Sequence, residues 1–451
     1  MAKSNAKKHI AVIGAGWAGC SGAVELVKAG HQVSLFEASR SLGGRARSVH
    51  LHDLELDNGQ HILLGAYQGC LSLMKELGVQ EQDALLRLPL QMCYPNAELD
   101  HGMEFIAPRL PAPLHLLIAL LKAKGLDKDD KLALARFSTT ARWMGWRMHH
   151  DCSVIELLER FEQTPRLCRL MWIPLCVAAL NTPPEHASAQ VFLNVLRDSL
   201  GARRAASDML IPKQDLSNII PNATAQLLTR HGSQLHLASA VSALHQVGEQ
   251  WHLEVNGKPH ETAFDGIVLA THPENAKQIL ASSDLLASTD LAQCDFTYEA
   301  ITTCYLQYAP EIKLARPLYA LLDQAEQQRW GQFVFDRGQL HNAQAGLLAV
   351  VISSAQAALQ RPHEQLANEI GAQLAHTLQM PQLAQAQWHQ IITEKRATYA
   401  CSPNLKRPLN QTQLPSLVLA GDYTANDYPA TLETAVMSGK QAAQSLISNM
   451  K

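Results

Sequence analysis

The sequence lacks several features that would indicate particular classes of protein. It contains no run of eighteen or more apolar residues, so we expect no transmembrane helix. It contains no dense block of lysine and arginine, and its formal net charge of −3 gives no indication of nucleic-acid binding. Its nine cysteines include no Cys-x-x-Cys pair, which disfavours a disulfide framework and a zinc site. We therefore expect reduced thiols and no bound metal, in a cytoplasmic protein.

The N-terminal residues have a superficial likeness to a secretory signal. Lys3, Lys7 and Lys8 precede an apolar run from Ile10 to Val24. Four glycines interrupt that run and no Ala-x-Ala cleavage signal follows it, so we expect no signal peptide. The 451 residues are 47% hydrophobic and 18% charged, which is typical of a folded protein with two or more domains.

A glycine-rich turn follows the first apolar segment. His9 to Ile13 has the β-branched character of a buried parallel strand, and Gly14, Gly16 and Gly19 come directly after it. In this spacing the first glycine permits a tight turn, the second lets the backbone approach a pyrophosphate, and the third lets a helix pack on the sheet. The composition of Cys20 to Ala29 predicts that helix.

An acidic residue completes the pattern of a dinucleotide site. The second apolar run, Gln32 to Phe36, ends at Glu37, where a carboxylate accepts hydrogen bonds from a ribose diol. Trp17 and Ala18 begin the helix whose N-terminus presents free N–H groups to phosphates, so we include them in the site.

The next glycines extend the likeness to flavoproteins. Gly43, Gly44 and Arg45 follow the acid, and this arrangement resembles the extended motif of the amine oxidase and phytoene desaturase superfamily. The resemblance implies bound FAD, with this segment lying along the diphosphate and ribityl chain and Arg45 offsetting phosphate charge. No cysteine follows Cys401, so we expect the FAD to be held non-covalently.

Two later segments match further parts of the same superfamily. Predicted strands at 234–237, 240–244 and 251–255 precede a buried strand over 265–271, and the resemblance places the backbone of Val241 against the adenine. Near the C-terminus a strand over 417–423 ends in Gly-Asp. The resemblance implies that Gly421 and Asp422 lie at the ribityl chain. It also implies that residues 428–436 open the last helix, which reaches about residue 448, and that the N-terminal dipole of this helix faces the flavin ring, with Thr431 and Leu432 at the cofactor.

These matches predict an α/β fold with two interleaved domains. The resemblance implies a discontinuous, Rossmann-type FAD-binding domain formed by 1–80, 216–280 and 413–451. The remaining segments, 81–215 and 281–412, would form an interleaved α+β substrate-binding domain. Within the second of these, 355–387 is rich in alanine and glutamine and is predicted to be helical.

One resemblance is narrower than the superfamily. The segments Asp57–Tyr67, Trp172–Cys176, Ala179–Pro184 and Tyr428–Glu433 resemble signatures of the squalene-associated flavoproteins of hopanoid-producing bacteria. That family is understood as hydroxysqualene dehydroxylases, which convert hydroxysqualene to squalene with reduced FAD. The resemblance therefore implies an isoprenoid lipid substrate and a role in squalene and hopanoid biosynthesis. It also places Gly59 and Gln60 at the cofactor.

The implied reaction needs a proton donor. Protonation of an allylic hydroxyl releases water, and reduced flavin can then deliver a hydride to the remaining allylic cation. His61 is our first choice for the acid because histidine is readily protonated near neutral pH, and Asp57 or Tyr67 could orient or replace it. Asp427, Tyr428 and Glu433 are further candidates.

Three other functions remain open at this point. A carotenoid or phytoene-type desaturase would share the fold and a lipid substrate but use its flavin in the oxidising direction. A flavin amine oxidase normally has an aromatic residue where Thr431 stands, which argues against amines. A non-enzymatic lipid carrier of the same fold would not use flavin. No second glycine fingerprint marks a nicotinamide domain, so we expect an external reductant, either NAD(P)H or a reductase.

The segment 105–126 is the other unusual part of the sequence. Prolines precede the apolar stretch Leu114–Leu121, and Lys122 and Lys124 follow it. It is too short to span a bilayer. An apolar helix with a basic end could lie in the membrane interface, at the inner face of the cell membrane, or pack as a buried core helix; both interpretations stay open.

Overall fold

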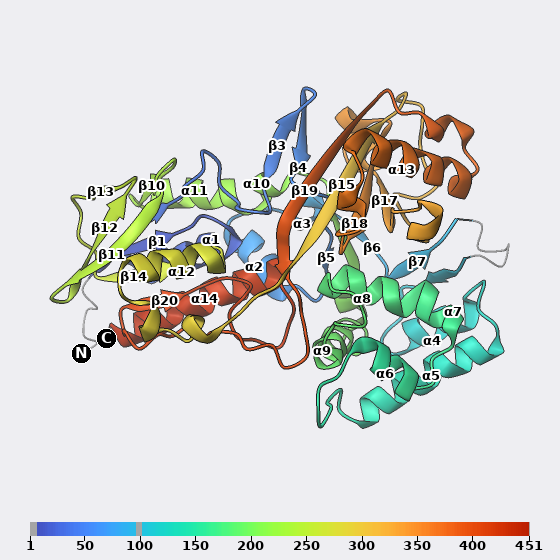
Figure 1. The fold of residues 1–451 in the computed structure, drawn as a ribbon, viewed down its shortest axis with the longest axis horizontal. Helices are drawn as coiled ribbons and strands as arrows, with labels where there is room; N and C mark the ends of the chain where they lie inside the picture. Colours follow the sequence, from blue (N-terminus) through green and yellow to red (C-terminus); the bar gives the residue numbers. More distant parts are fainter. Residues whose placement is uncertain (1–6, 96–101, 451) are drawn as a thin grey trace.

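The computed structural model describes residues 7–95 and 102–450. One half of the molecule is built on a five-stranded parallel sheet with strand order β10-β2-β1-β14-β20 (Figure 1). Every neighbouring pair in this sheet is parallel. The strands are β1 (His9–Ile13), β2 (Gln32–Phe36), β10 (Gln234–His236), β14 (Gly266–Leu269) and β20 (Leu417–Leu419). Strands β1, β14 and β20 are almost wholly buried, as expected for a parallel sheet covered on both faces.

Two helices far apart in sequence pack against each other beside this sheet (Figure 1). These are α1 (Trp17–Lys28) and α14 (Leu432–Asn449). A Cβ added to Gly439 would lie 1.9 Å from the Ala18 carbonyl oxygen, and one added to Gly22 would lie 3.2 Å from the Gly439 oxygen. The helices therefore touch through their backbones, and both N-termini are fixed relative to the sheet.

Further small elements surround the parallel sheet. An antiparallel three-stranded sheet is formed by β11 (Val241–Val247), β12 (Gln250–Val255) and β13 (Lys258–Pro259), and it lies beside α12 (Pro273–Ser282). Helices α10 (Leu216–Ile219) and α11 (Pro221–Arg230) precede β10.

A second five-stranded sheet, antiparallel, forms the other half of the molecule (Figure 1). Its order is β16-β17-β18-β15-β19. The strands are β15 (Tyr298–Gln307), β16 (Leu318–Ala320), β17 (Phe333–Asp336), β18 (Leu347–Ser353) and β19 (Trp388–Tyr399). Helix α13 (His363–Leu378) packs on one face, and Leu366, Ile370 and Leu374 enter the core there.

A group of helices lies at one end of this second half (Figure 1). They are α4 (Leu114–Lys122), α5 (Lys128–Trp143), α6 (Val154–Arg160), α7 (Pro165–Leu167), α8 (Ile173–Leu180) and α9 (Ala189–Ser199), with one π-helical turn over Cys168–Trp172. Their core is aromatic: Trp172 packs against Phe137, with ring centroids 4.4 Å apart, and against Phe192. Both segments that carry the narrower family resemblance near residue 180 belong to this helical group.

Short strands connect the two halves. A hairpin is formed by β3 (Ser48–Leu51) and β4 (Leu54–Asp57), and a further pair by β7 (Gln91–Cys93) and β8 (Glu104–Ile106). Strand β9 (Met209–Pro212) lies between β5 (Leu63–Leu64) and β6 (Leu85–Leu88). Helices α2 (Gln68–Glu76) and α3 (Glu81–Ala84) lie between β5 and β6 in the chain.

The α/β fold predicted from the sequence is confirmed. All five strands of the parallel sheet come from 1–80, 216–280 and 413–451, and we propose these segments as the cofactor domain and the rest as the substrate domain. The helix predicted over 355–387 is shorter than expected. It begins after Pro362 and ends at Gln379, whose left-handed backbone conformation stops the helix.

Other details differ slightly from the expectation. The last helix begins at Leu432 rather than near Tyr428, because Thr431 is its N-cap. Strand β11 begins at Val241 and continues to Val247. The nine cysteines are free thiols, most of them buried. Over the ranges 7–95 and 102–450, no helix has both the length and the apolar character needed to cross a membrane.

Candidate functional site

In the first glycine turn, two of the three glycines have no room for a side chain, whereas the third borders empty space. Gly14 has φ +98°, and a Cβ there would lie 2.6 Å from the Ala270 oxygen. A Cβ on Gly19 would lie 1.8 Å from the Gly14 oxygen. A Cβ on Gly16 would meet no protein atom within 4 Å. The backbone therefore requires Gly14 and Gly19, whereas Gly16 faces open space at the N-terminus of α1.

A second glycine loop lies against this turn. Gly43 donates its backbone N–H to the Ala15 oxygen at 2.8 Å and forms a bridge with Gly16. Gly43 and Gly44 both have positive φ, of +105° and +61°. A Cβ on Gly44 would lie 3.3 Å from the Gly16 Cα. The two loops thus form a cradle made of backbone, which suits a diphosphate that approaches N–H groups closely.

Glu37 lies at the carboxyl end of β2 and lines the same space. Its carboxylate accepts the backbone N–H of Ala15 at 2.8 Å and that of Ser39 at 2.9 Å. These bonds fix the carboxylate beside the glycine turn, and each oxygen keeps further lone pairs for a ribose diol. We propose Glu37 as the group that binds the adenosine ribose. Val241 and its neighbours Ser239, Ala240 and Ser242 line the same cavity.

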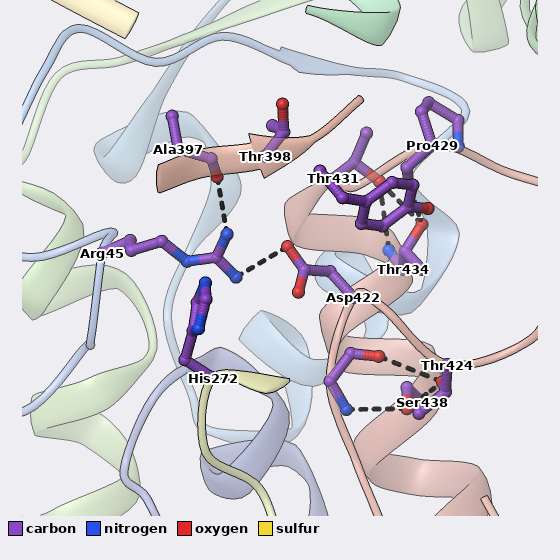
Figure 2. Close-up of polar contacts among 12 residues, drawn as sticks. Arg45, His272, Ala397, Thr398, Asp422, Thr424, Pro429, Thr431, Thr434 and Ser438 are labelled. Atoms are coloured by element: carbon purple, nitrogen blue, oxygen red, sulfur yellow. Dashed lines mark hydrogen bonds and ion pairs between the residues drawn. The ribbon is translucent and has the colours of Figure 1, made fainter. Parts of the chain in front are cut away.

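Arg45 joins three distant parts of the chain (Figure 2). Its Nη1 donates to the Ala397 oxygen at 2.6 Å, and its Nη2 contacts the Asp422 carboxylate at 2.7 Å. Asp422 follows β20 and Ala397 belongs to β19, so the guanidinium connects the parallel sheet to strand β19 of the antiparallel sheet. Both charged side chains line the cavity.

The N-terminus of α14 is held by side-chain caps (Figure 2). The Thr431 hydroxyl accepts the backbone N–H of Thr434, whose own hydroxyl donates to the Pro429 oxygen at 2.8 Å. The Ser438 hydroxyl accepts the Gly421 N–H at 3.0 Å. Thr431 and Leu432 line the cavity, so the positive end of the helix dipole faces into it.

One cavity of about 1510 Å³ contains all of these groups. Ligand pockets for single small molecules usually measure about 300–1,000 Å³, so this one has room for a cofactor and a second ligand. Away from the glycine cradle its wall is apolar and comes from the helical group and the antiparallel sheet. Examples of this wall are Met92, Phe105, Leu120, Leu134, Phe192 and Phe333.

His61 lines the cavity but is not arranged as an acid. Its Nδ1 donates to the Gly59 oxygen at 2.7 Å, which leaves Nε2 with a lone pair. Burial lowers the pKa of the ring, and Arg45 lowers it further, while the bond to Gly59 opposes this. At neutral pH the imidazole is therefore uncharged and its cavity-side nitrogen accepts hydrogen bonds.

The prediction that Asp57 orients or replaces His61 requires a correction. It lies at the end of β4 with its side chain only 2% exposed, and it does not line the cavity. One carboxylate oxygen accepts the Leu216 N–H at 2.8 Å, whereas His61 is oriented by the backbone of Gly59. Asp57 therefore neither orients nor replaces His61. Burial raises the pKa of Asp57 to about 7 although Arg337 lies close enough to oppose the shift.

Gln60 is a site residue whose polar side chain is used within the protein. Its Oε1 accepts from Arg337 at 3.0 Å and its Nε2 donates to the His61 oxygen at 2.8 Å. Together with Gly59, whose φ is +97°, it shapes the turn that carries His61 into the cavity.

Tyr67 and Glu433 meet between α2 and α14. The Glu433 carboxylate accepts the backbone N–H groups of Gly69 at 2.7 Å and Cys70 at 2.8 Å, and so caps α2. Tyr67 lines the cavity nearby. Burial raises the pKa of its phenol, and Cys70 and Glu433 add to the shift while the Thr431 side chain opposes it. The phenol is therefore protonated at neutral pH.

Tyr428, one of the further candidates, meets in the cavity the carboxylate of Asp198, a residue that no sequence pattern had indicated. The Tyr428 phenol donates a hydrogen bond to the Asp198 carboxylate, and Arg197 holds the same carboxylate through two N–H groups at 2.8 Å. Arg197 lowers the pKa of Asp198. Asp198 and Tyr428 line the cavity, but Asp427 does not, and its backbone oxygen accepts from Asn194.

The site residues fit FAD by their own geometry. The side-chain-free cradle at Gly16 and Gly44, the anchored carboxylate of Glu37, the Arg45 guanidinium and the α14 N-terminus lie around one cavity, and they offer the groups that the diphosphate, the ribose and the flavin ring of FAD would need. This arrangement defines a flavin-dependent oxidoreductase. Residues 17–447 match the model of the flavin containing amine oxidoreductase family, so the chain belongs to that family and uses a flavin cofactor.

Individual proteins to which this chain is similar indicate a smaller group within the family. A protein of Rhodopseudomonas palustris named hydroxysqualene dehydroxylase is 29% identical over 450 residues, covering 97% of each chain. A zeta-carotene desaturase of Synechocystis is 24% identical and covers 98% of this chain and 97% of its own. An oxidoreductase structure from Methanosarcina mazei superposes with a TM-score of 0.72 at 15% identity, covering 97% of this chain and all of that one. The resemblance to hydroxysqualene dehydroxylases found from the sequence is thereby confirmed.

Proposed function

We propose that this enzyme removes the hydroxyl group of hydroxysqualene and yields squalene, with reduced, non-covalently held FAD as electron donor, in the synthesis of squalene and hopanoids. The relative from Rhodopseudomonas palustris is named for that activity, and its similarity to this protein extends over nearly the full length of both chains. The zeta-carotene desaturase adds a second relative whose name refers to an isoprenoid. The observation that carries the proposal is the continuity of the cavity, which runs from the glycine cradle to an apolar chamber.

The apolar chamber suits a long hydrocarbon. Its side chains come from β7, β8, α4, α5, α9 and β17, and they are mainly leucine, phenylalanine and methionine. Such walls exclude water from the site where a carbocation would otherwise be captured. Asp198, whose carboxylate is held by Arg197 and Tyr428, is a polar exception on this wall.

The structure changes our choice of proton donor. Among the three residues first considered, only Tyr67 both lines the cavity and is protonated at neutral pH. We propose that the Tyr67 phenol donates to the substrate hydroxyl while His61 Nε2 accepts from it and fixes its orientation. The carbon–oxygen bond then breaks with release of water. Bound FAD, when reduced, supplies the hydride that replaces the hydroxyl.

A desaturase is the second candidate. The similarity to zeta-carotene desaturase favours it, and the fold and cavity serve both reactions. An amine oxidase is disfavoured because Thr431 is the N-cap of α14 and provides no aromatic ring at that position. A flavin-free lipid carrier is disfavoured by the residues that fit FAD.

We also propose that the protein contacts the inner face of the cell membrane through α4. Leu116 and Leu120 on this helix line the cavity, whereas Leu114 and Leu121 are 50% and 62% exposed. Lys122 ends the helix. A helix with one apolar face toward the cavity and another toward the outside gives a hydrocarbon substrate a short path from the bilayer.

The reductant is external to this chain in our proposal, and NAD(P)H or a separate reductase would supply the electrons. The experiment that tests the reaction is anaerobic incubation of photoreduced enzyme with hydroxysqualene. We expect squalene and oxidised flavin in equal amounts. Products with additional double bonds, formed by the oxidised enzyme, would instead identify a desaturase. A purified protein without bound flavin would contradict both.

A further inference from the structure

Two polar side-chain atoms at the carboxyl end of β14 have no hydrogen-bond partner among the described residues. Thr271 Oγ1 and His272 Nε2 are shielded from solvent and make no hydrogen bond with any residue in the described ranges. Both residues line the cavity. They directly follow Ala270, whose oxygen would lie 2.6 Å from a Cβ on Gly14. The two unpaired groups are therefore next to the glycine turn, at the edge of the sheet where ligands of parallel α/β folds bind.

The orientation of the His272 ring is fixed by its role as N-cap of α12. Its Nδ1 accepts the backbone N–H of Glu274 at 3.4 Å. The Tyr298 ring lies against it with centroids 5.0 Å apart, and the Tyr298 hydroxyl donates to Glu274 Oε1 at 2.9 Å. Because Nδ1 accepts, the neutral ring carries its proton on Nε2, which is the nitrogen without a partner.

The N–H group at His272 Nε2 lacks a hydrogen-bond acceptor. Figure 2 shows the His272 ring directed at the Arg45 guanidinium, which already contacts Ala397 and Asp422. Burial lowers the pKa of His272 to about 4; Arg45 and Arg396 lower it too, while Asp422 and Glu274 oppose the shift. The ring is therefore neutral, with an N–H donor beside a cation. An oxygen of an anionic or polyhydroxy ligand would accept from both groups.

We propose that His272, assisted by Thr271, is a cofactor-binding residue whose Nε2–H donates to an oxygen of the diphosphate–ribityl part of FAD. Arg45 binds the same part of the cofactor. Strand β14 of the parallel sheet thus contributes to the site through the side chains that follow it, in addition to the glycines after β1 and the acid after β2. This inference rests on the flavin cofactor and is independent of the substrate.

The test separates the Nε2 donor from the helix cap. In His272→Asn the amide oxygen can still accept the Glu274 N–H, but the Nε2–H donor beside Arg45 is lost; His272→Ala removes both. His245→Asn, at an exposed histidine of β11 that pairs with Glu254, is the matched control. Each flavin-free protein is titrated with FAD by flavin fluorescence, and its thermal unfolding is measured without FAD.

We expect His272→Asn to raise the Kd for FAD about tenfold or more, as for a lost hydrogen bond to a charged group, with unchanged unfolding of the flavin-free protein. His245→Asn should bind FAD as the wild type does. Thr271→Val leaves the helix cap at His272 intact and should weaken FAD binding to a smaller extent. This variant tests the proposal if both His272 variants fold poorly. FAD affinity within twofold of wild type in both His272→Asn and Thr271→Val would overturn the proposal.

Competition by ADP locates the contact. ADP carries the diphosphate and lacks the ribityl chain. Parallel weakening of ADP and FAD in His272→Asn places the acceptor on the diphosphate, and weakening of FAD alone places it on the ribityl chain. Both results support the inference. Because the readout is binding to oxidised FAD, it is unaffected by whether hydroxysqualene or another lipid is the substrate.

Discussion

Substitution of Gly16 by alanine tests the cofactor cradle without disturbing the fold. Gly16 is the N-cap of α1 with φ −70°, which alanine adopts freely, and its added Cβ would meet no protein atom within 4 Å. Alanine is a poorer N-cap than glycine, which costs about 1 kcal/mol or less. The methyl group would instead occupy the space that a diphosphate needs. Loss of one charge-assisted hydrogen bond to a phosphate costs about 1.5–3 kcal/mol, equivalent to about 10–150-fold in Kd.

Gly19→Ala is the matched comparison because the same methyl is introduced one helical turn away. Its Cβ would lie 1.8 Å from the Gly14 oxygen, so the helix or the turn must move, at a cost of about 3 kcal/mol or more. We expect Gly16→Ala to unfold like the wild type without FAD and to bind FAD weakly. Gly19→Ala should be destabilised even without FAD. The assays are thermal unfolding and fluorescence titration of flavin-free protein. Wild-type FAD affinity in Gly16→Ala would refute the position of the diphosphate.

Three further substitutions test other parts of the site. The pKa of Asp57 is raised from 3.8 to about 7 in the folded chain, so the native state holds this proton more tightly and the carboxyl destabilises the fold as pH rises from about 4 through 7. Asp57→Asn should therefore match the wild type in denaturant unfolding at pH 4 and exceed it by a few kcal/mol at pH 8; equal stability at both values would contradict the buried environment. Tyr67→Phe should keep the flavin spectrum and lower the dehydroxylation rate about 100-fold or more, measured by single turnover, and an unchanged rate would remove Tyr67 as the donor. Leu114→Glu with Leu121→Glu should reduce cosedimentation with anionic lipid vesicles at least tenfold, whereas Val247→Glu, at a residue 64% exposed on β11, should have no effect; equal losses would reject α4 as the contact.

The cofactor half of the site could be predicted because its signals are local. The strand, the glycines and Glu37 lie within one continuous segment, and each has a backbone requirement that a sequence motif records. The last helix was expected to open near Tyr428, whereas Thr431 caps it and Leu432 begins it, because the Thr431 hydroxyl accepts the backbone N–H of Thr434.

The orientation of side chains could not be predicted in the same way. Whether Asp57 or His61 enters the cavity depends on the pairing of β3 with β4 and on the Leu216 N–H, which comes from a distant segment. Asp198 and Tyr428 meet only when α9 packs beside the segment before α14. His272 was not predicted as a site residue, because its proximity to Arg45 arises only when the end of β14 packs beside the second glycine loop.

The strand order of the parallel sheet affects how the protein is made on the ribosome. β14 pairs with β20 over Ile267–Leu269, yet about 150 residues of the antiparallel half are synthesised between them. At a translation rate of roughly 5–20 residues per second, the β14 edge of the nascent sheet stays unpaired for about 7–30 s. Asp422 and the α14 N-terminus follow β20 in the chain, so the complete flavin site can form only after the antiparallel half has been synthesised. Until then FAD cannot stabilise the parallel sheet, and the β14 edge needs other protection from mispairing, such as a chaperone.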